Sequence, residues 1–153
     1  MSEVRSSGPL RWVSETLGSL FKTETLDPKE EVFISVLFCL LGSLARADGV
    51  VSAEEAAHGE ELIDRMELPK VGRKLAVHSF ERGRAGGLDV DAEIRRFLAV
   101  YRSSSTHSEQ LLEALLTLAR SDGRMRIPEK SWLTRVGKSL GIDADVMKQR
   151  IGL

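Results

Sequence analysis

Residues 41–49 read LGSLARADG, and residues 115–123 read LLTLARSDG. The two stretches align at an offset of 74 residues, and the same offset places Glu55 on Glu129. Of the 15 positions aligned over 41–55 and 115–129, 7 are identical. About one identity would be expected by chance at ordinary residue usage. The sequence therefore predicts an internal repeat, in which each copy is a leucine-rich helix, an Asp-Gly turn and an acid seven residues after the Asp.

The hydrophobic spacing is helical along almost the whole chain, and no run has the two-residue period of a half-buried strand. Asp27 followed by Pro28 predicts the start of a helix that runs to about Ala47. Its apolar run, VFISVLFCLLGSL at residues 32–44, has 13 residues and is too short to cross a membrane, so we expect a central core helix. Further helices are predicted at residues 10–22, 52–67, 69–83, 89–101, 106–123, 128–140 and 143–151, with Thr106 and Asp143 as N-caps.

The fold class predicted from these patterns is all-α: a single-domain bundle of about 7–8 helices with an internal pseudo-two-fold helix–turn–helix repeat. Residues 1–26 are predicted to form an N-terminal amphipathic helix and a linker. Residues 27–153 form the helical domain, with repeat 1 at about 28–68, connecting helices at 69–103 and repeat 2 at about 107–152.

Composition narrows the function classes. The 153 residues carry a net charge of −1, which argues against a dedicated nucleic-acid binder. A single cysteine, Cys39, excludes an internal disulfide and a zinc site of several cysteines, and its place in the apolar helix predicts a buried small hydrophobe. No residues form a nucleophile-plus-base pattern, so we expect no enzyme and no cofactor. With no secretory leader and no membrane span, the expected location is cytoplasmic.

The Asp-Gly turns imitate the second half of a calcium-binding EF-hand loop. Such a loop also needs oxygen ligands at its first and third positions, where this chain has Leu44 and Arg46 in one copy and Leu118 and Arg120 in the other. We therefore expect that the turns have a structural role. In that role Arg46 would pair with Glu129, and Arg120 with Glu55, across the two copies. The alternative is a composite divalent-metal site that uses the carboxylates of both turns, at Asp48, Glu55, Asp122 and Glu129.

Charge is distributed unevenly along the chain. Residues 24–67 contain 11 acids and 3 bases, whereas residues 70–102 contain 8 bases and 4 acids. One interpretation is complementarity between the helices of the bundle. The other is a partner-binding acidic face made of Glu54, Glu60, Asp64 and Glu67. Residues 10–22 could pack on the core, bind a partner or contact a membrane surface peripherally, and the chain could form a homodimer.

The strings LLGSLARADGVVSAEE, ELIDRMEL and LLEALLTLARSDGRMRIPEKSWLTRVGKSLGI make this chain resemble the TerB-like family of tellurite resistance, and within it the TerB-like region of the co-chaperone DjlA. The resemblance covers about Glu30 to Gly152 and implies an all-helical bundle, a bacterial setting in the cytoplasm or at the inner membrane face, and a role in stress responses. In this family the acids of the two Asp-Gly turns are suspected of contacting a metal ion. The resemblance places those acids here at Asp48, Glu55, Asp122 and Glu129. The membrane span and the J domain of DjlA-like proteins are missing here, so stimulation of the chaperone DnaK is not expected. What we expect is a non-catalytic adaptor that binds a protein partner.

Overall fold

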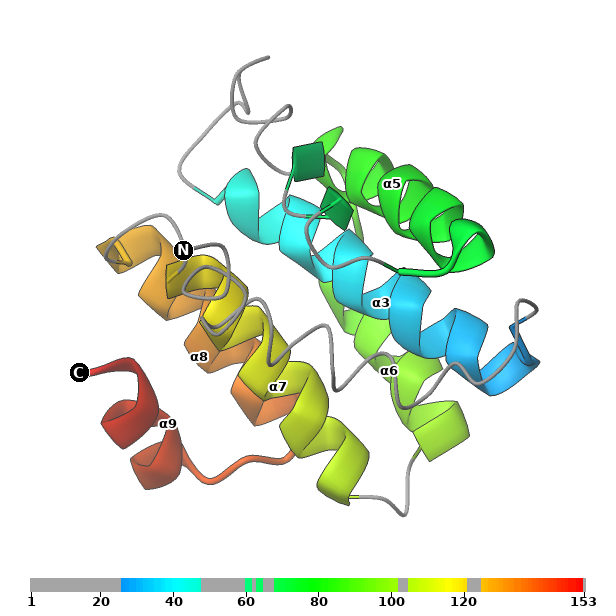
Figure 1. The fold of residues 1–153 in the computed structure, drawn as a ribbon. Helices are drawn as coiled ribbons and strands as arrows, with labels where there is room; N and C mark the ends of the chain where they lie inside the picture. Colours follow the sequence, from blue (N-terminus) through cyan, green and yellow to red (C-terminus); the bar gives the residue numbers. More distant parts are fainter. Residues whose placement is uncertain are drawn as a thin grey trace, which may run out of the picture.

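The computed structural model describes residues 26–47, 60–61, 63–64, 68–101, 105–120 and 125–152. These residues form helices and the segments that connect them and contain no strand, which confirms the all-α class. Six helices have defined bounds (Figure 1): α3 (Pro28–Ala45), α5 (Lys70–Arg84), α6 (Val90–Tyr101), α7 (Ser105–Arg120), α8 (Ile127–Ser139) and α9 (Ala144–Ile151). The predicted number of 7–8 is higher than this. The predicted helix at 10–22 lies outside the described residues, and of the one at 52–67 only residues 60, 61, 63 and 64 are described, all helical.

Helix α3 begins where the sequence predicts. The Asp27 carboxylate accepts a hydrogen bond from the Glu30 N–H at 2.9 Å, and the Glu30 carboxylate accepts one from the Asp27 N–H at 3.0 Å. Pro28 occupies the first turn, where its missing N–H costs nothing. This reciprocal capping box satisfies two main-chain donors and fixes the register of the helix.

The apolar residues of α3 form the centre of the molecule. The helix runs between α5 on one side and α7 with α8 on the other (Figure 1), and it also contacts α6. Its buried residues are Phe33, Ile34, Val36, Leu37, Phe38, Cys39, Leu40, Leu41, Gly42 and Leu44. Among the described residues, no helix is long and apolar enough to cross a membrane. The prediction of a central core helix is therefore confirmed.

Two glycines allow α3 and α5 to approach each other closely. A Cβ atom on Gly42 would lie 2.3 Å from the Phe80 carbonyl oxygen, and one on Gly83 would lie 2.1 Å from the Cys39 carbonyl oxygen. No side chain fits at such distances, so the two helix backbones are in direct contact at this crossing.

Helices α3, α6 and α7 meet around an aromatic cluster. The Phe97 and Tyr101 rings stack with centroids 4.9 Å apart, and Phe33 meets both rings edge-on, at 5.8 and 5.9 Å. The Tyr101 hydroxyl donates to the Lys29 carbonyl oxygen at 2.7 Å, and His107 lies against the Tyr101 ring with centroids 4.5 Å apart. The only tyrosine in the chain thus joins the first turn of α3 to the end of α6.

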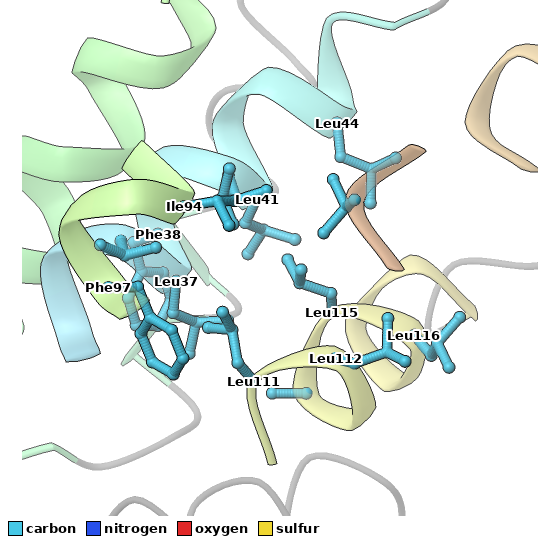
Figure 2. Close-up of a cluster of buried hydrophobic side chains, with 14 of the residues drawn as sticks. Leu37, Phe38, Leu41, Leu44, Ile94, Phe97, Leu111, Leu112, Leu115 and Leu116 are labelled. Carbon is cyan, nitrogen blue, oxygen red and sulfur yellow. The ribbon is translucent and has the colours of Figure 1, made fainter. Parts of the chain in front are cut away.

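The second copy of the repeat packs against the first through leucines. Figure 2 shows Leu37, Phe38, Leu41 and Leu44 of α3 near Leu111, Leu112, Leu115 and Leu116 of α7, with Ile94 and Phe97 of α6 beside them. All of these side chains are buried. Leu37 and Leu41 correspond to Leu111 and Leu115 at the offset of 74 residues, so equivalent positions of both copies contribute to one core.

The helix bounds give helix α9, which lies within the predicted repeat 2, an equivalent in the first half of the chain. The first residue of α5, Lys70, and the first residue of α9, Ala144, are separated by the same 74 residues as the Asp-Gly turns. Helices α3 and α7 also correspond at this offset, with ends that differ by a few residues. Helix α5, which the sequence placed in the connection, is therefore the counterpart of α9.

The caps of the second copy agree with the prediction in part. Asp143 caps α9 by accepting from the N–H groups of Asp145 at 3.0 Å and Val146 at 3.3 Å, as expected. Thr106 is not an N-cap, because α7 already begins at Ser105. Glu109 stands three residues after Thr106, the spacing of a capping box, but its carboxylate forms an ion pair with Arg150 of α9 at 2.5 Å.

Candidate functional site

Five of the eight predicted site residues lie outside the described residues: Asp48, Glu54, Glu55, Glu67 and Asp122. The other three, Glu60, Asp64 and Glu129, are described. Both Asp-Gly turns and half of the acidic face therefore remain predictions from the sequence. The structure bears on them through the residues that surround them.

Glu129 acts at the start of α8. Its carboxylate accepts a hydrogen bond from the Arg126 N–H at 2.9 Å, in the first turn of the helix. An anion is favourable there because the first N–H groups of a helix carry partial positive charge. Glu129 thus has a capping role, and at least one of its oxygens is used for it.

The arginine of the repeated motif has the same role in both copies. The Arg46 guanidinium donates to the carbonyl oxygen of Arg84, the last residue of α5, at 3.1 Å. The Arg120 guanidinium donates to the carbonyl oxygen of Arg150, in the last turn of α9. The expected pairing of Arg46 with Glu129 is wrong, because the Arg46 guanidinium instead donates to the Arg84 carbonyl oxygen, which is left free at the end of α5.

Gly86 makes room for this arginine. It follows the end of α5 with φ +92°, and a Cβ atom there would lie 2.8 Å from the Arg46 guanidinium carbon. The turn after α5 and the segment after α3 are therefore in contact. Arg46 is two residues before Asp48, so the arginine connects the first Asp-Gly segment to the end of α5.

The described part of the acidic face is partly neutralised. Asp64 is exposed and pairs with Arg73 of α5, with both Nε and Nη2 of the arginine on one carboxylate oxygen, at 2.6 and 2.5 Å. Glu60 is half-buried on the same short helical segment. The ion pair of Asp64 with Arg73 is an example of charge complementarity between helices, which was the first interpretation of the uneven charge.

No group of three or more His, Cys, Asp or Glu side chains that could hold a metal ion occurs among the described residues. Three of the four carboxylates of the predicted metal site lie outside that search. Glu129, the fourth, is on the surface of the bundle at the start of α8 and is half-buried.

The structure also reveals a polar cluster that the sequence did not predict. The buried carboxylate of Glu93 accepts from Arg82 of α5 at 3.2 Å and from Arg96 at 2.9 Å. Arg82 also donates to the Cys39 sulfur at 2.8 Å, and Arg96 donates to the Ser35 hydroxyl of α3. The cluster joins α3, α5 and α6. Only the spacing of Glu93 and Arg96, three residues apart on one helix, could have indicated it from the sequence.

Cys39 is buried, as predicted. Burial raises the pKa of its thiol, and the positive charge of Arg82 lowers it to a smaller extent. The neutral thiol is a poor nucleophile, so Cys39 is a packing residue and a hydrogen-bond acceptor within this cluster.

An all-helical bundle in which α3 and α5 correspond to α7 and α9, with one core between them, is the class of protein that the described residues define. Residues 26–150 match the family described as tellurite resistance protein TerB. The match covers most of the chain, and the chain belongs to this family.

The chain is also similar to the co-chaperone protein DjlA of several bacteria. It is 26% identical over 135 residues to the proteins of Haemophilus influenzae and Pasteurella multocida, which covers 88% of this chain and 46% of each relative. For Shewanella oneidensis the identity is 26% over 113 residues, or 74% of this chain and 43% of the relative. The chain thus spans less than half the length of these relatives. No solved structure matches it.

Proposed function

We propose that this chain is a non-catalytic module that binds a protein partner and acts as an adaptor in a bacterial stress response, in the cytoplasm or at the inner membrane face. The observation that carries the proposal is the match to co-chaperones over 88% of this chain and under half of each relative. A segment that recurs inside a longer co-chaperone has the character of a module.

The charges of the described surface support an interaction role. Glu60 and Asp64 lie on a short helical segment, and Asp64 contacts Arg73 of α5, so acidic and basic groups meet at one solvent-facing edge. Charged groups at such an edge raise the rate and the specificity of encounter with a complementary protein.

The test is capture of a partner from the cell that encodes the chain. Cross-linked partners of the tagged protein are identified, and the capture is repeated with the double variant Glu60→Lys/Asp64→Lys. We expect the partner to be lost. The control variant Glu31→Lys/Asp145→Lys, which reverses two exposed acids on α3 and α9, is expected to retain it. Equal capture by the two variants would contradict the proposal for this face.

A divalent-metal site is the second candidate, because the repeat places an acid at the same two positions in both copies: Asp48 and Asp122, and Glu55 and Glu129. Carboxylate oxygens suit hard divalent cations. Calorimetric titration of the protein with several divalent metals tests this, with Asp48→Asn/Asp122→Asn as the variant. Saturable heat that the variant loses would support the site, and no heat from the wild-type protein would end the idea.

A further inference from the structure

Helix α9 is anchored to the bundle by two apolar side chains. Figure 1 shows it at the edge of the bundle, beside α8 and on the side away from α5. Its Met147 and Ile151 side chains are buried, and Met147 lies against Gly137 of α8, where a Cβ atom would collide with it. The other residues of this eight-residue helix are exposed or half-buried, and Val146 is 37% exposed.

The contact of α9 with α7 is polar. The Arg150 guanidinium pairs with Glu109 at 2.5 Å and lies 3.8 Å from Glu113, and Arg120 donates to the Arg150 main-chain carbonyl oxygen. The Nη1 atom of Arg150 is buried without a hydrogen-bond partner, so its loss of water is only partly compensated. We term Glu109, Glu113, Arg120 and Gly137 the α9-binding surface.

The corresponding contact in the first copy is of a different kind. Helix α5 has 15 residues and α9 has 8. The backbone of α5 touches that of α3, because Gly42 and Gly83 place no side chain between them. The offset of 74 residues places Leu116 at the position of Gly42, so the second copy has a bulky side chain there. A short helix that is attached through side chains should open at a smaller free-energy cost than the rest of the bundle.

We infer that α9 is a latch, and that when it opens the α9-binding surface takes a basic amphipathic helix of the partner protein in its place. This inference deepens the proposed interaction function and rests on it. Glu109 and Glu113 attract a cationic side chain, and both are 43% exposed even with α9 bound. Gly137 leaves room for a long apolar side chain, and Arg120 binds a carbonyl oxygen in the last turn of a helix.

Helix α9 itself shows the pattern that the partner helix needs. Met147 and Ile151 are four residues apart, and Arg150 follows Met147 by three residues, so all three side chains lie near one face. A longer helix with this pattern would make contacts that α9 lacks and would displace it. A basic partner also agrees with the acidic face at Glu60 and Asp64.

Hydrogen exchange of the full chain, followed by mass spectrometry, tests whether the latch opens. The amides of α9 are expected to exchange at least about tenfold faster than those of α5, because α9 opens locally. The variant Arg150→Glu, which places a third carboxylate beside Glu109 and Glu113, should accelerate exchange in α9. Lys148→Glu makes the same charge change at an exposed lysine of α9 and should not. Equal exchange in α9 and α5 of the wild type would contradict the latch.

Binding of a peptide tests the occupant. The probe is a fluorescent peptide with the sequence of residues 143–152, and its control carries Arg150→Glu. By fluorescence anisotropy, the Arg150→Glu chain should bind the natural probe at least about tenfold more tightly than the wild type, whose own α9 competes. The Glu109→Lys/Glu113→Lys chain should prefer the control peptide, because the charges are exchanged. Circular dichroism melting curves check that each variant is folded.

Three further results would overturn the inference. Equal binding by the Arg150→Glu and Lys148→Glu chains would show that α9 does not block the surface, and no preference for the control peptide would remove the role of the two glutamates. Sedimentation of the wild type as a dimer that Arg150→Glu dissociates would assign the surface to a second copy of the chain. The peptide assay needs no cellular partner. A partner captured through Glu60 and Asp64 equally by the wild type and Arg150→Glu would refute the latch and leave the proposed function standing.

Discussion

The Arg46 guanidinium lies 3.1 Å from the carbonyl oxygen of Arg84, and through this bond the segment after α3 is attached to the end of α5. Its equivalent, Arg120, binds the Arg150 carbonyl oxygen in the last turn of α9. The arginine of the repeated motif therefore positions α5 in the first copy and α9 in the second. This gives a structural reason for an Arg two residues before the Asp-Gly turn. An EF-hand loop would need an oxygen ligand at that position, so calcium binding does not explain the Arg.

Replacing Arg46 with Ala should destabilise the fold by about 1–3 kcal/mol, because a partly buried carbonyl loses a charged donor. Urea unfolding followed by circular dichroism measures this loss. Arg135→Ala is the control: Arg135 is 59% exposed and pairs with Asp91 at 3.2 Å, so its removal should change the free energy of unfolding by less than about 0.5 kcal/mol. Similar losses in both variants would contradict the role assigned to Arg46.

Replacing two glycines of α5 by alanine should change the stability of the fold in opposite directions. Gly83→Ala should destabilise the fold by about 1–3 kcal/mol, because its Cβ would lie 2.1 Å from the Cys39 carbonyl oxygen. Gly72→Ala should stabilise it by about 0.5–1 kcal/mol, because the nearest atom to that Cβ is 3.8 Å away and alanine favours a helix. Thermal melting of the two variants tests the difference in sign. A stable Gly83→Ala protein would show that α3 and α5 are farther apart than described.

The phenol of Tyr101 should lose its proton at a higher pH than an ordinary tyrosine. Burial raises the pKa of its phenol from the ordinary value of 10.0 to about 12, and the charges of Asp27 and Glu30 add to the effect. Since the folded-state pKa is above the unfolded-state value, the stabilisation is complete below pH 10.0 and is lost as the pH rises towards about 12. Tyr101 is the only tyrosine, so the ultraviolet absorbance of the phenolate reports it alone. A folded protein that titrates at the ordinary value would refute the burial of this ring.

Cys39 should be protected from thiol reagents in the native protein. It is buried, and burial raises its pKa, so little thiolate is available to react. The reaction with a chromogenic disulfide reagent is expected to be slow in buffer and fast in urea. Fast modification of the native protein would mean that the crossing of α3 and α5 opens readily.

Much of the fold follows from local signals in the sequence. Asp27 and Pro28 identify the start of α3, and the uniformly apolar residues after them predict its central position, because no polar face remains for solvent. Asp143 likewise identifies the start of α9. Thr106 shows the limit of such signals, because the Glu109 that would complete its cap is used by Arg150, which is distant in sequence.

The candidate site was less accessible to sequence reasoning. The repeated arginine was recognised, but its acceptors are main-chain carbonyls, which carry no sequence signature. The Glu93 cluster depends on three helices meeting, and periodicity does not reveal which helices are neighbours. The carboxylates of the Asp-Gly turns were predicted from the repeat alone, and Glu129 shows a capping function at one of these positions.

The shared leucine core has an evolutionary consequence. Leu41 and Leu115 are equivalent residues of the two copies, yet both are buried in one cluster. A chain with a single copy would expose this apolar face to water, at an expense of about 25 cal/mol for each Å². An ancestor of half the length would therefore have had to associate as a pair of identical chains, and gene duplication with fusion would have converted that assembly into one polypeptide.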